Sequence, residues 1–297
     1  MRLRIATLGG ACALAAVASV STARAEDAPR QTACTKLDFC YCVKPELLPA
    51  IADNVAKVRK IIADRKAEGK EIGYLSIPLS PAGGGSFAIN SAAAGNIAES
   101  ITTRFGKSSV WILNPAALGG DHMTGANGAD YMYMWTEILE GATGHGEDFD
   151  FLYFVGQTDF AGYFLASHED KQGQAQPTKD RPKQVKDEPR VPDNYLGWLD
   201  AAFDERLASL PAFKTEVEQG QVTRAGFRNY YGLRASVAFS YGSHDEWNIA
   251  RMLNERRRGA DNFGIANQLA IFFDGQAVNP GDFDAATTPG DAGRCVK

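Results

Sequence analysis

The sequence lacks features that would point to several common classes of protein. Its 297 residues include 36 acidic and 31 basic ones, so the formal net charge is −5. A chain without a basic surplus has no field to hold a nucleic acid polymer, which excludes that class of partner. No apolar run after the N-terminal segment approaches the roughly 20 residues that a membrane span needs. The motifs G-x-x-x-x-G-K-[ST], G-x-G-x-x-G and G-x-S-x-G are also absent.

Cysteine is scarce as well, and no histidine lies near the cysteine cluster. Four cysteines remain beyond the N-terminal segment, three of them close together and one near the C-terminal end. Without nearby histidines a metal site is not favoured, so we predict two structural disulfides, at least one of which joins the two ends of the chain. The connectivity stays open. The four residues are Cys34, Cys40, Cys42 and Cys295.

The N-terminal segment reads as a secretory signal. Arg2 and Arg4 precede an apolar run over residues 5–20, and an A-x-A site ends at Ala25. We therefore expect cleavage near Ala25 and an exported protein, periplasmic or secreted. Export is consistent with the disulfides, because oxidising compartments favour them.

Apolar periodicity predicts an α/β fold. Short apolar runs typical of buried strands alternate with helical patterns, which indicates a Rossmann-like, flavodoxin-like parallel sheet with helices on both faces. The strands are expected at residues 71–80, 108–115, 149–156, 234–242 and 269–275. The helices are expected at residues 45–67, 90–105, 129–140, 195–210 and from about 240 to 258.

The same patterns divide the chain into segments. One large charged insertion interrupts the α/β domain, and its part at 168–194 reads as a long loop or flap. The expected segments are a signal peptide (1–25), a cysteine-containing segment with a helix (26–71), the α/β domain (72–279, with the insertion at about 157–233) and an irregular tail (280–297).

A glycine-rich loop, PAGGGS, follows the first strand and precedes a helix. Glycines let a backbone approach a ligand closely, and free amides at a helix start attract phosphate or carboxylate groups. We therefore predict substrate contacts here, with a flexible turn as the alternative. The candidates are Gly83, Gly84, Gly85 and Ser86.

The segment SYGSHDEWNIA carries a carboxylate pair at a helix start. In one interpretation Ser243 caps the helix and Glu246 completes an S-x-x-E capping box. In the other, Glu246 serves a reaction centre, because the strand that contains Tyr74 ends at the same edge of the sheet. The direction in which the Glu246 carboxylate points decides between them.

Two motifs resemble those of the nucleoside 2-deoxyribosyltransferase family. Residues 74–79, YLSIPL, are similar to Y-L-A-G-P-[LF], and residues 242–250, GSHDEWNIA, are similar to G-[ST]-x-x-E-[LW]-x-x-A. The first motif departs at Ser76 and Ile77, where the family has Ala and Gly. The resemblance covers residues 72–156 and 234–274, and the insertion between them has no counterpart in the family.

The resemblance implies a covalent mechanism at an N-glycosidic bond. Glu246 would attack C1′ of the sugar to form a glycosyl ester, and Tyr74 would orient its carboxylate. A further acid would protonate or hold the leaving base. The candidates for that acid are Asp130, Glu137 and Asp159. The predicted substrate contacts at the helix are Gly242, Ser243 and Asn248.

Two functions follow as hypotheses. The first is an exported enzyme that cleaves or transfers at the N-glycosidic bond of a nucleoside or nucleotide. The alternative is a non-catalytic periplasmic binding or interaction module on the same fold. No cofactor and no metal are predicted, since Asp121 and His122 in the loop GGDHMTG lack a recognised ligand spacing. The partner is a small-molecule nucleoside or nucleotide, and a homo-oligomer is left open.

Overall fold

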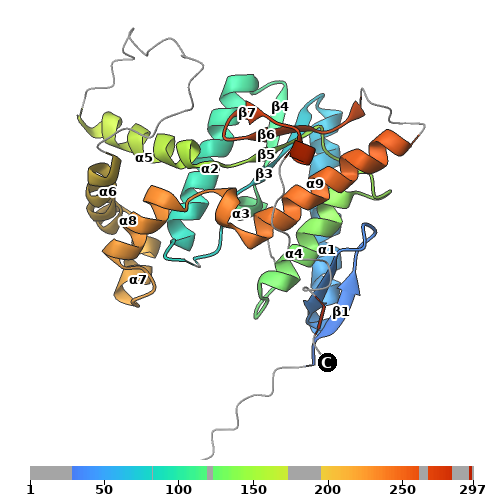
Figure 1. The fold of residues 1–297 in the computed structure, drawn as a ribbon, viewed down its shortest axis with the longest axis horizontal. Coiled ribbons are helices and arrows are strands. Elements are labelled where there is room, and N and C mark those ends of the chain that lie inside the picture. Colours follow the sequence, from blue (N-terminus) through green and yellow to red (C-terminus); the bar gives the residue numbers. More distant parts are fainter. Residues whose placement is uncertain are drawn as a thin grey trace, which may run out of the picture.

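The structure is a computed structural model of the 297-residue chain (Figure 1). It describes residues 29–81, 83–118, 123–172, 195–260, 267–282 and 294–295. The expected signal peptide, Asp121, His122 and most of the expected flap lie outside these residues. A sheet lies between two layers of helices, which confirms the predicted Rossmann-like α/β class.

The central sheet has the strand order β4-β3-β5-β6-β7. All neighbouring strands are parallel except β6 and β7, which are antiparallel. The first strand of the sheet, β3, lies between the next two along the chain, so its carboxyl end is at a switch point where ligands bind in open α/β sheets. The strands are β3 (Glu71–Ser76), β4 (Val110–Leu113), β5 (Phe151–Phe154), β6 (Ala270–Phe273) and β7 (Gln276–Ala277).

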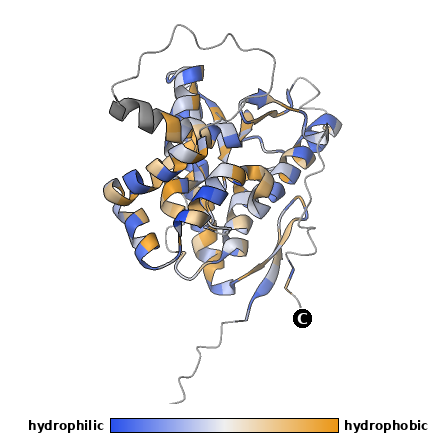
Figure 2. Ribbon diagram, turned by 60° about the vertical axis from the view of Figure 1, so that its left-hand side comes forward, coloured by the Kyte–Doolittle hydropathy of each residue, from blue (hydrophilic) through white to orange (hydrophobic). Residues whose placement is uncertain are grey.

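The helices that were predicted begin and end close to their predicted limits. Figure 2 shows that the helices carry both hydrophobic and hydrophilic residues. The insertion contributes most of the helices that were not expected. The α-helices are α1 (Leu48–Ala67), α2 (Phe87–Phe105), α3 (Pro115–Leu118), α4 (Gly128–Glu140), α5 (Gln157–Gln172), α6 (Tyr195–Ser209), α7 (Pro211–Glu218), α8 (Arg224–Leu233) and α9 (Tyr241–Gly259). The 3-10 helices are η1 (Pro45–Leu47), η2 (Val237–Phe239) and η4 (Pro280–Asp282).

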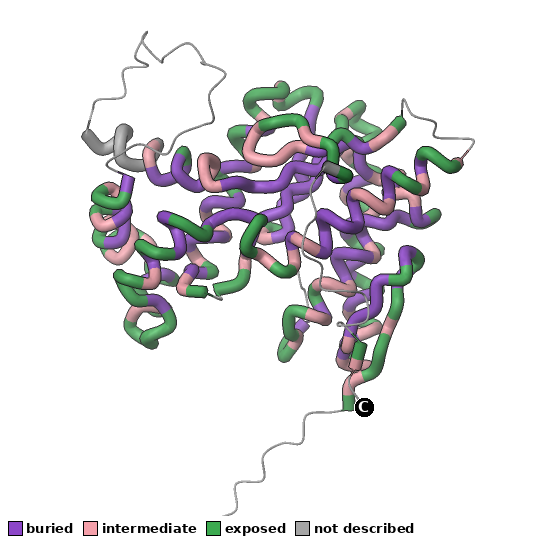
Figure 3. Tube along the Cα trace, in the orientation of Figure 1, coloured by how far each residue is buried: buried purple, intermediate pink, exposed green. Residues whose placement is uncertain are grey.

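One face of the sheet is covered by α4 and α9. Trp135 of α4 contacts Tyr74 of β3, with ring centroids 6.1 Å apart. Trp247 of α9 contacts Phe154 of β5, with centroids 4.8 Å apart. Figure 3 shows β3 and β5 buried along most of their length. Both helices therefore bring their side chains directly onto the two central strands.

The opposite face is covered by α2. Phe105 packs its ring against Phe151 of β5 and Phe272 of β6, with centroid separations of 6.0 and 6.1 Å. Helix α5 packs against α2 on this side. Gly73 of β3 also faces this layer, and a Cβ atom there would lie 2.3 Å from the ring of Phe151. Glycine is required at this position because the aromatic ring occupies the space.

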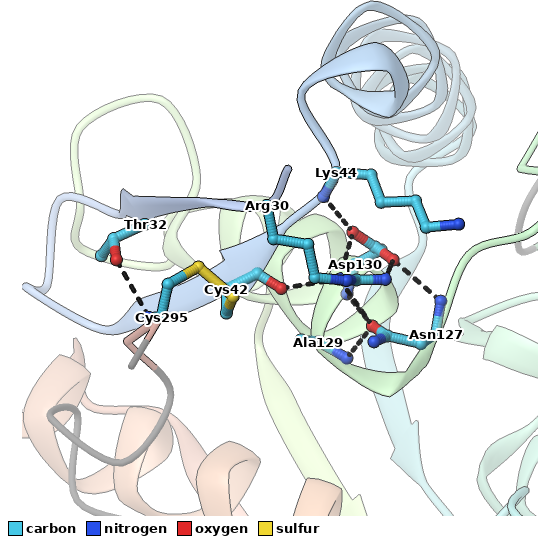
Figure 4. Close-up of a disulfide and its surroundings, with 8 residues drawn as sticks. All are labelled: Arg30, Thr32, Cys42, Lys44, Asn127, Ala129, Asp130 and Cys295. Carbon is cyan, nitrogen blue, oxygen red and sulfur yellow. Dashed lines mark hydrogen bonds and ion pairs between the residues drawn. A yellow bond between two sulfur atoms is a disulfide. The ribbon is translucent and has the colours of Figure 1, made fainter. Parts of the chain in front are cut away.

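An N-terminal hairpin, β1 (Gln31–Cys34) and β2 (Cys40–Val43), packs against α4. The two predicted disulfides are confirmed, and their connectivity is Cys34–Cys40 and Cys42–Cys295. The second joins the hairpin to the C-terminal end of the chain, as Figure 4 shows. No described helix is long and apolar enough to cross a membrane.

The described part of the insertion is a helical unit, α5 to α8. Helix α5 runs to Gln172 and so occupies the start of the expected loop at 168–194. An aromatic cluster holds the unit together, because each of its rings packs edge-on or tilted against others of the cluster. The cluster is formed by Phe164, Phe203, Phe213, Phe227 and Tyr231.

The strand predicted at residues 234–242 is absent, so this prediction was wrong. Val237 donates its backbone N–H to the carbonyl of Val155, just beyond β5, and then enters η2. Because β5 is already paired with β3 on one side and β6 on the other, the sheet has no free edge there for a further strand. The segment instead leads directly into α9.

Candidate functional site

Helix α9 begins three residues earlier than its capping pattern predicts. Ser240 is the N-cap, and its hydroxyl accepts the backbone N–H of Ser243 at 3.3 Å. Ser243 is therefore inside the first turn and does not cap the helix. Glu246 lies in the second turn, so the predicted capping box is wrong.

The Glu246 carboxylate points away from its own helix and toward β3. Tyr74 donates its hydroxyl to Oε1 at 2.5 Å, and Ser76 donates to Oε2 at 2.5 Å. Tyr74 and Ser76 are two residues apart on one strand, so both side chains lie on the same face of the sheet. The predicted proximity of Tyr74 and Glu246 is confirmed. The bond from Ser76 was not predicted, and it occurs at a position where the resemblance departs from its family.

Burial controls the charge state of this site. The side chain of Glu246 is only 6% exposed, and burial raises its pKa to about 7. The hydrogen bonds from Ser76 and Tyr74 lower this pKa, whereas the neighbouring charge of Asp245 raises it. Burial and the charge of Glu246 also raise the pKa of Tyr74, so Tyr74 is a stable hydrogen-bond donor at neutral pH.

The raised pKa predicts a pH-dependent effect on stability. Folding raises the pKa of Glu246 from 4.5 to about 7, so the folded state binds more protons than the unfolded state between these values. The contribution of Glu246 to the free energy of unfolding therefore falls as the pH rises through this window. We expect Glu246→Gln to flatten this part of the pH dependence in urea unfolding at a series of pH values. An unchanged slope would contradict the burial of an ionisable Glu246.

Asp159 forms its own hydrogen-bonded group at the start of α5. It accepts the Tyr153 hydroxyl at 2.8 Å and the Gly156 backbone N–H at 3.0 Å. Burial raises its pKa to about 7, the Gly156 and Tyr153 bonds lower it, and the charge of Asp274 raises it. Asp274 accepts the backbone N–H of Asp159 at 3.1 Å. This group therefore connects the ends of β5 and β6 to α5.

The sheet separates Asp159 from Glu246. Tyr153 pairs with Leu75 of β3, and consecutive residues of a strand point to opposite faces. Tyr153 and its partner Asp159 are thus on the α2 side, whereas Tyr74 and Glu246 are on the α9 side. Asp159 does not join the nucleophile candidate, and its predicted role as the second acid is not supported by the geometry.

Asp130 is a structural residue at the start of α4 (Figure 4). Its carboxylate is fully buried and accepts the backbone N–H groups of Asn127 and Lys44, each at 2.8 Å. Arg30 adds an ion pair at 3.2 Å. Because all these partners belong to the hairpin or to the helix cap, Asp130 fastens β2 to α4.

The structural role of Asp130 can be tested by Asp130→Ala. The substitution leaves two buried N–H groups and a partly buried guanidinium without their acceptor. We expect the free energy of unfolding to fall by about 3 kcal/mol, measured by urea denaturation. Turnover by the remaining folded protein should stay near that of the parent. A stable variant that has lost turnover would instead assign Asp130 to catalysis.

Glu137 is also remote from the candidate site. It is partly exposed on α4 and pairs with Lys36 at 3.5 Å. Its backbone carbonyl accepts Arg59 of α1 at 2.7 Å. Glu137 thus belongs to the contact among α1, α4 and the hairpin, and its predicted acid role has no geometric support.

The glycine loop packs against the helical unit. A Cβ atom on Gly85 would lie 2.8 Å from the Tyr230 ring, and one on Gly84 would lie 3.1 Å from the carbonyl of Gly226. Ser86 caps α2 and donates its hydroxyl to Glu216 of α7. No described contact joins this loop, Gly83 included, to Glu246. The glycines are explained by close packing against α8.

The three predicted contacts on α9 differ in character. Gly242 permits a close approach of α9 to α4, because a Cβ atom there would lie 3.1 Å from the sulfur of Met132. Ser243 is buried in the first turn. Asn248 is 4% exposed, and its Nδ2 has no hydrogen-bond partner in the described part of the chain. Only Asn248 retains an unused polar group.

Asp245 belongs to the same buried region and was missed. It is 7% exposed, its Oδ1 has no hydrogen-bond partner among the described residues, and burial raises its pKa to about 7. Burial is the main cause of the raised pKa of Tyr41, and the charge of an ionised Asp245 raises that pKa further. The sequence contained a usable signal, since apolar residues surround this pair on several sides of the helix. That pattern is typical of a helix buried all round.

Comparison with known proteins adds no further assignment. No family model, curated protein or solved structure matches the chain. Within the described residues, no three His, Cys, Asp or Glu side chains are grouped so that they could hold a metal ion. Function is therefore inferred from the geometry around Glu246.

Proposed function

We propose that the protein is an exported enzyme that breaks the N-glycosidic bond of a nucleoside or nucleotide, with Glu246 as nucleophile. The observation that carries the proposal is the position of Glu246, whose carboxylate accepts hydroxyls of β3 instead of capping α9. Its carboxylate lies beside the carboxyl end of β3, at the switch point of the sheet. The pairing of Tyr74 with Glu246 is also the one that the motif resemblance implies.

The chemistry divides into two steps. An oxygen of Glu246 attacks C1′, the C1′–N bond breaks, and its electron pair leaves with the base, which takes a proton from an acid. Water then attacks C1′ and gives a proton back to the deprotonated acid, while the electron pair of the ester C1′–O bond returns to Glu246. Tyr74 and Ser76 hold the carboxylate in a single orientation and stabilise its charge.

Hydrolysis suits an exported protein better than transfer to a second base. Residues 1–25 resemble a secretory signal, and the two disulfides are typical of an oxidising compartment. Hydrolysis needs only water as its second reactant, whereas deoxyribosyl exchange needs a supply of free bases and nucleosides.

A binding module is the second candidate, because both oxygens of Glu246 are occupied and its side chain is buried. The two functions are separated by incubating the purified mature protein with nucleosides, nucleotides and dinucleotides. The enzyme releases free base, which chromatography detects. A panel without released base, together with ligand-induced thermal stabilisation, would favour the binding module.

A further inference from the structure

Two neighbouring carboxyl groups are buried on α9, and no cation among the described residues compensates them. Asp245 and Glu246 are 7% and 6% exposed. Burial raises the pKa of each, and no basic group in the described part of the chain lowers either one. Two buried carboxyl groups on adjacent residues do not both ionise readily, because neither is solvated and an ionised Asp245 raises the pKa of Glu246. At neutral pH the pair therefore favours one negative charge and one proton.

The hydrogen bonds indicate where that proton resides. Both oxygens of Glu246 accept hydroxyl donors, from Tyr74 and Ser76, and such donors stabilise the ionised form. No described residue donates to Oδ1 of Asp245. The hydroxyl donors thus favour the carboxylate at Glu246, and because an ionised Asp245 raises the pKa of Glu246, the proton of the pair then resides on Asp245. Such a division of roles between two acids is the arrangement that acid and nucleophile catalysis requires.

A second buried polar group without a partner lies beside Asp245 on α9. Asn248, 4% exposed, has an Nδ2 without a partner among the described residues. With 3.6 residues per turn, Glu246 is displaced from Asp245 by about 100° around the helix axis. Asn248 is displaced from Asp245 by about 60° in the opposite direction. Asp245 is thus between them. A buried donor without a partner is destabilising, and an acceptor on a ligand would offset that cost.

From this arrangement we infer that Asp245 is the general acid for the leaving base and that Asn248 holds a carbonyl oxygen beside the protonated nitrogen. The inference rests on the proposed function. A base that presents a ring nitrogen next to a carbonyl oxygen is a 6-oxopurine, through N7 and O6. The substrate class is therefore a 6-oxopurine nucleoside or nucleotide.

The proton balance follows directly. As Glu246 bonds to C1′, the electron pair of the C1′–N9 bond moves to the purine, and the Oδ1 proton of Asp245 moves to N7. The base leaves neutral, and Asp245 becomes a carboxylate. In the second step Asp245 takes a proton from the attacking water, and Glu246 recovers its electron pair from the ester. One water is consumed, and base and sugar are released.

The test compares inosine with 7-methylinosine. The methylated base departs as a neutral molecule without a proton, so its release needs no acid. We expect Asp245→Asn to slow the first-turnover release of hypoxanthine by about a hundredfold or more, with 7-methylhypoxanthine release close to that of the parent. Retained cleavage of 7-methylinosine also demonstrates that the variant is folded.

The possible results separate the two claims. Equal losses on both substrates, or full activity on inosine, would overturn the role of Asp245. Glu246→Gln should lose both substrates, and Glu255→Gln, an exposed acid on the same helix, should keep both. If Glu246→Gln keeps both while Asp245→Asn discriminates between them, the nucleophile assignment fails and the acid stands. A parent protein that releases neither base would overturn both.

Discussion

Glu246→Gln is expected to reduce the release of free base by about a thousandfold or more, because a catalytic nucleophile contributes an effect of this order. The amide cannot form the ester with C1′, yet it fits the same space. It can still accept one hydroxyl from Tyr74 or Ser76. Base release is followed by chromatography, and folding by the thermal unfolding of parent and variant.

A matched substitution on the same helix controls for the loss of a carboxylate. Glu255 is exposed and pairs only weakly with Arg251, at 3.9 Å. Glu255→Gln should therefore leave base release unchanged. If Glu246→Gln retained the activity of the parent, Glu246 would be a structural acid and the proposed enzyme would lose its nucleophile.

Removal of the Cys42–Cys295 disulfide is expected to have the largest effect on stability. This bridge closes a loop between residues 253 positions apart, so its loss greatly increases the freedom of the unfolded chain. The double variant Cys42→Ser, Cys295→Ser should lose about 4 kcal/mol in the free energy of unfolding. Urea denaturation without reductant measures the difference.

The other disulfide provides the comparison. Cys34 and Cys40 are only 6 residues apart within the hairpin, so their bridge restricts the unfolded chain far less. The variant Cys34→Ser, Cys40→Ser should therefore lose less stability. An equal or larger loss at this short loop would show that the bridge to the C-terminal end is not what stabilises the fold.

Local patterns were sufficient to predict the class of fold. Strands β3, β4, β5 and β6 are short apolar runs, and each lies within its predicted range. The pattern failed at residues 234–242, where an equally apolar run forms η2 and the start of α9. The deciding factor is not local, because the neighbours of β5 already occupy both of its edges. The hairpin strands β1 and β2 were also missed.

The candidate site could be predicted only in part. Tyr74 and Glu246 were expected together because their elements end at one edge of the sheet, and their hydrogen bond confirms this. The second acid was sought at Asp130, Glu137 and Asp159, which lie in other contacts. Asp245 was not among the candidates. The apolar residues around it signalled burial, but the elements that bury it, among them α4, come from other parts of the chain.

The most direct test of the account is the capture of the glycosyl ester on Glu246. A nucleoside with fluorine in place of its 2′-hydroxyl destabilises the oxocarbenium-like transition states and slows breakdown of the ester. After an acid quench, mass spectrometry of the intact protein and its peptides locates the added sugar. The account predicts one fluorinated sugar on the peptide that contains Glu246, and none in Glu246→Gln. Released base without an adduct, or an adduct on another residue, would contradict it.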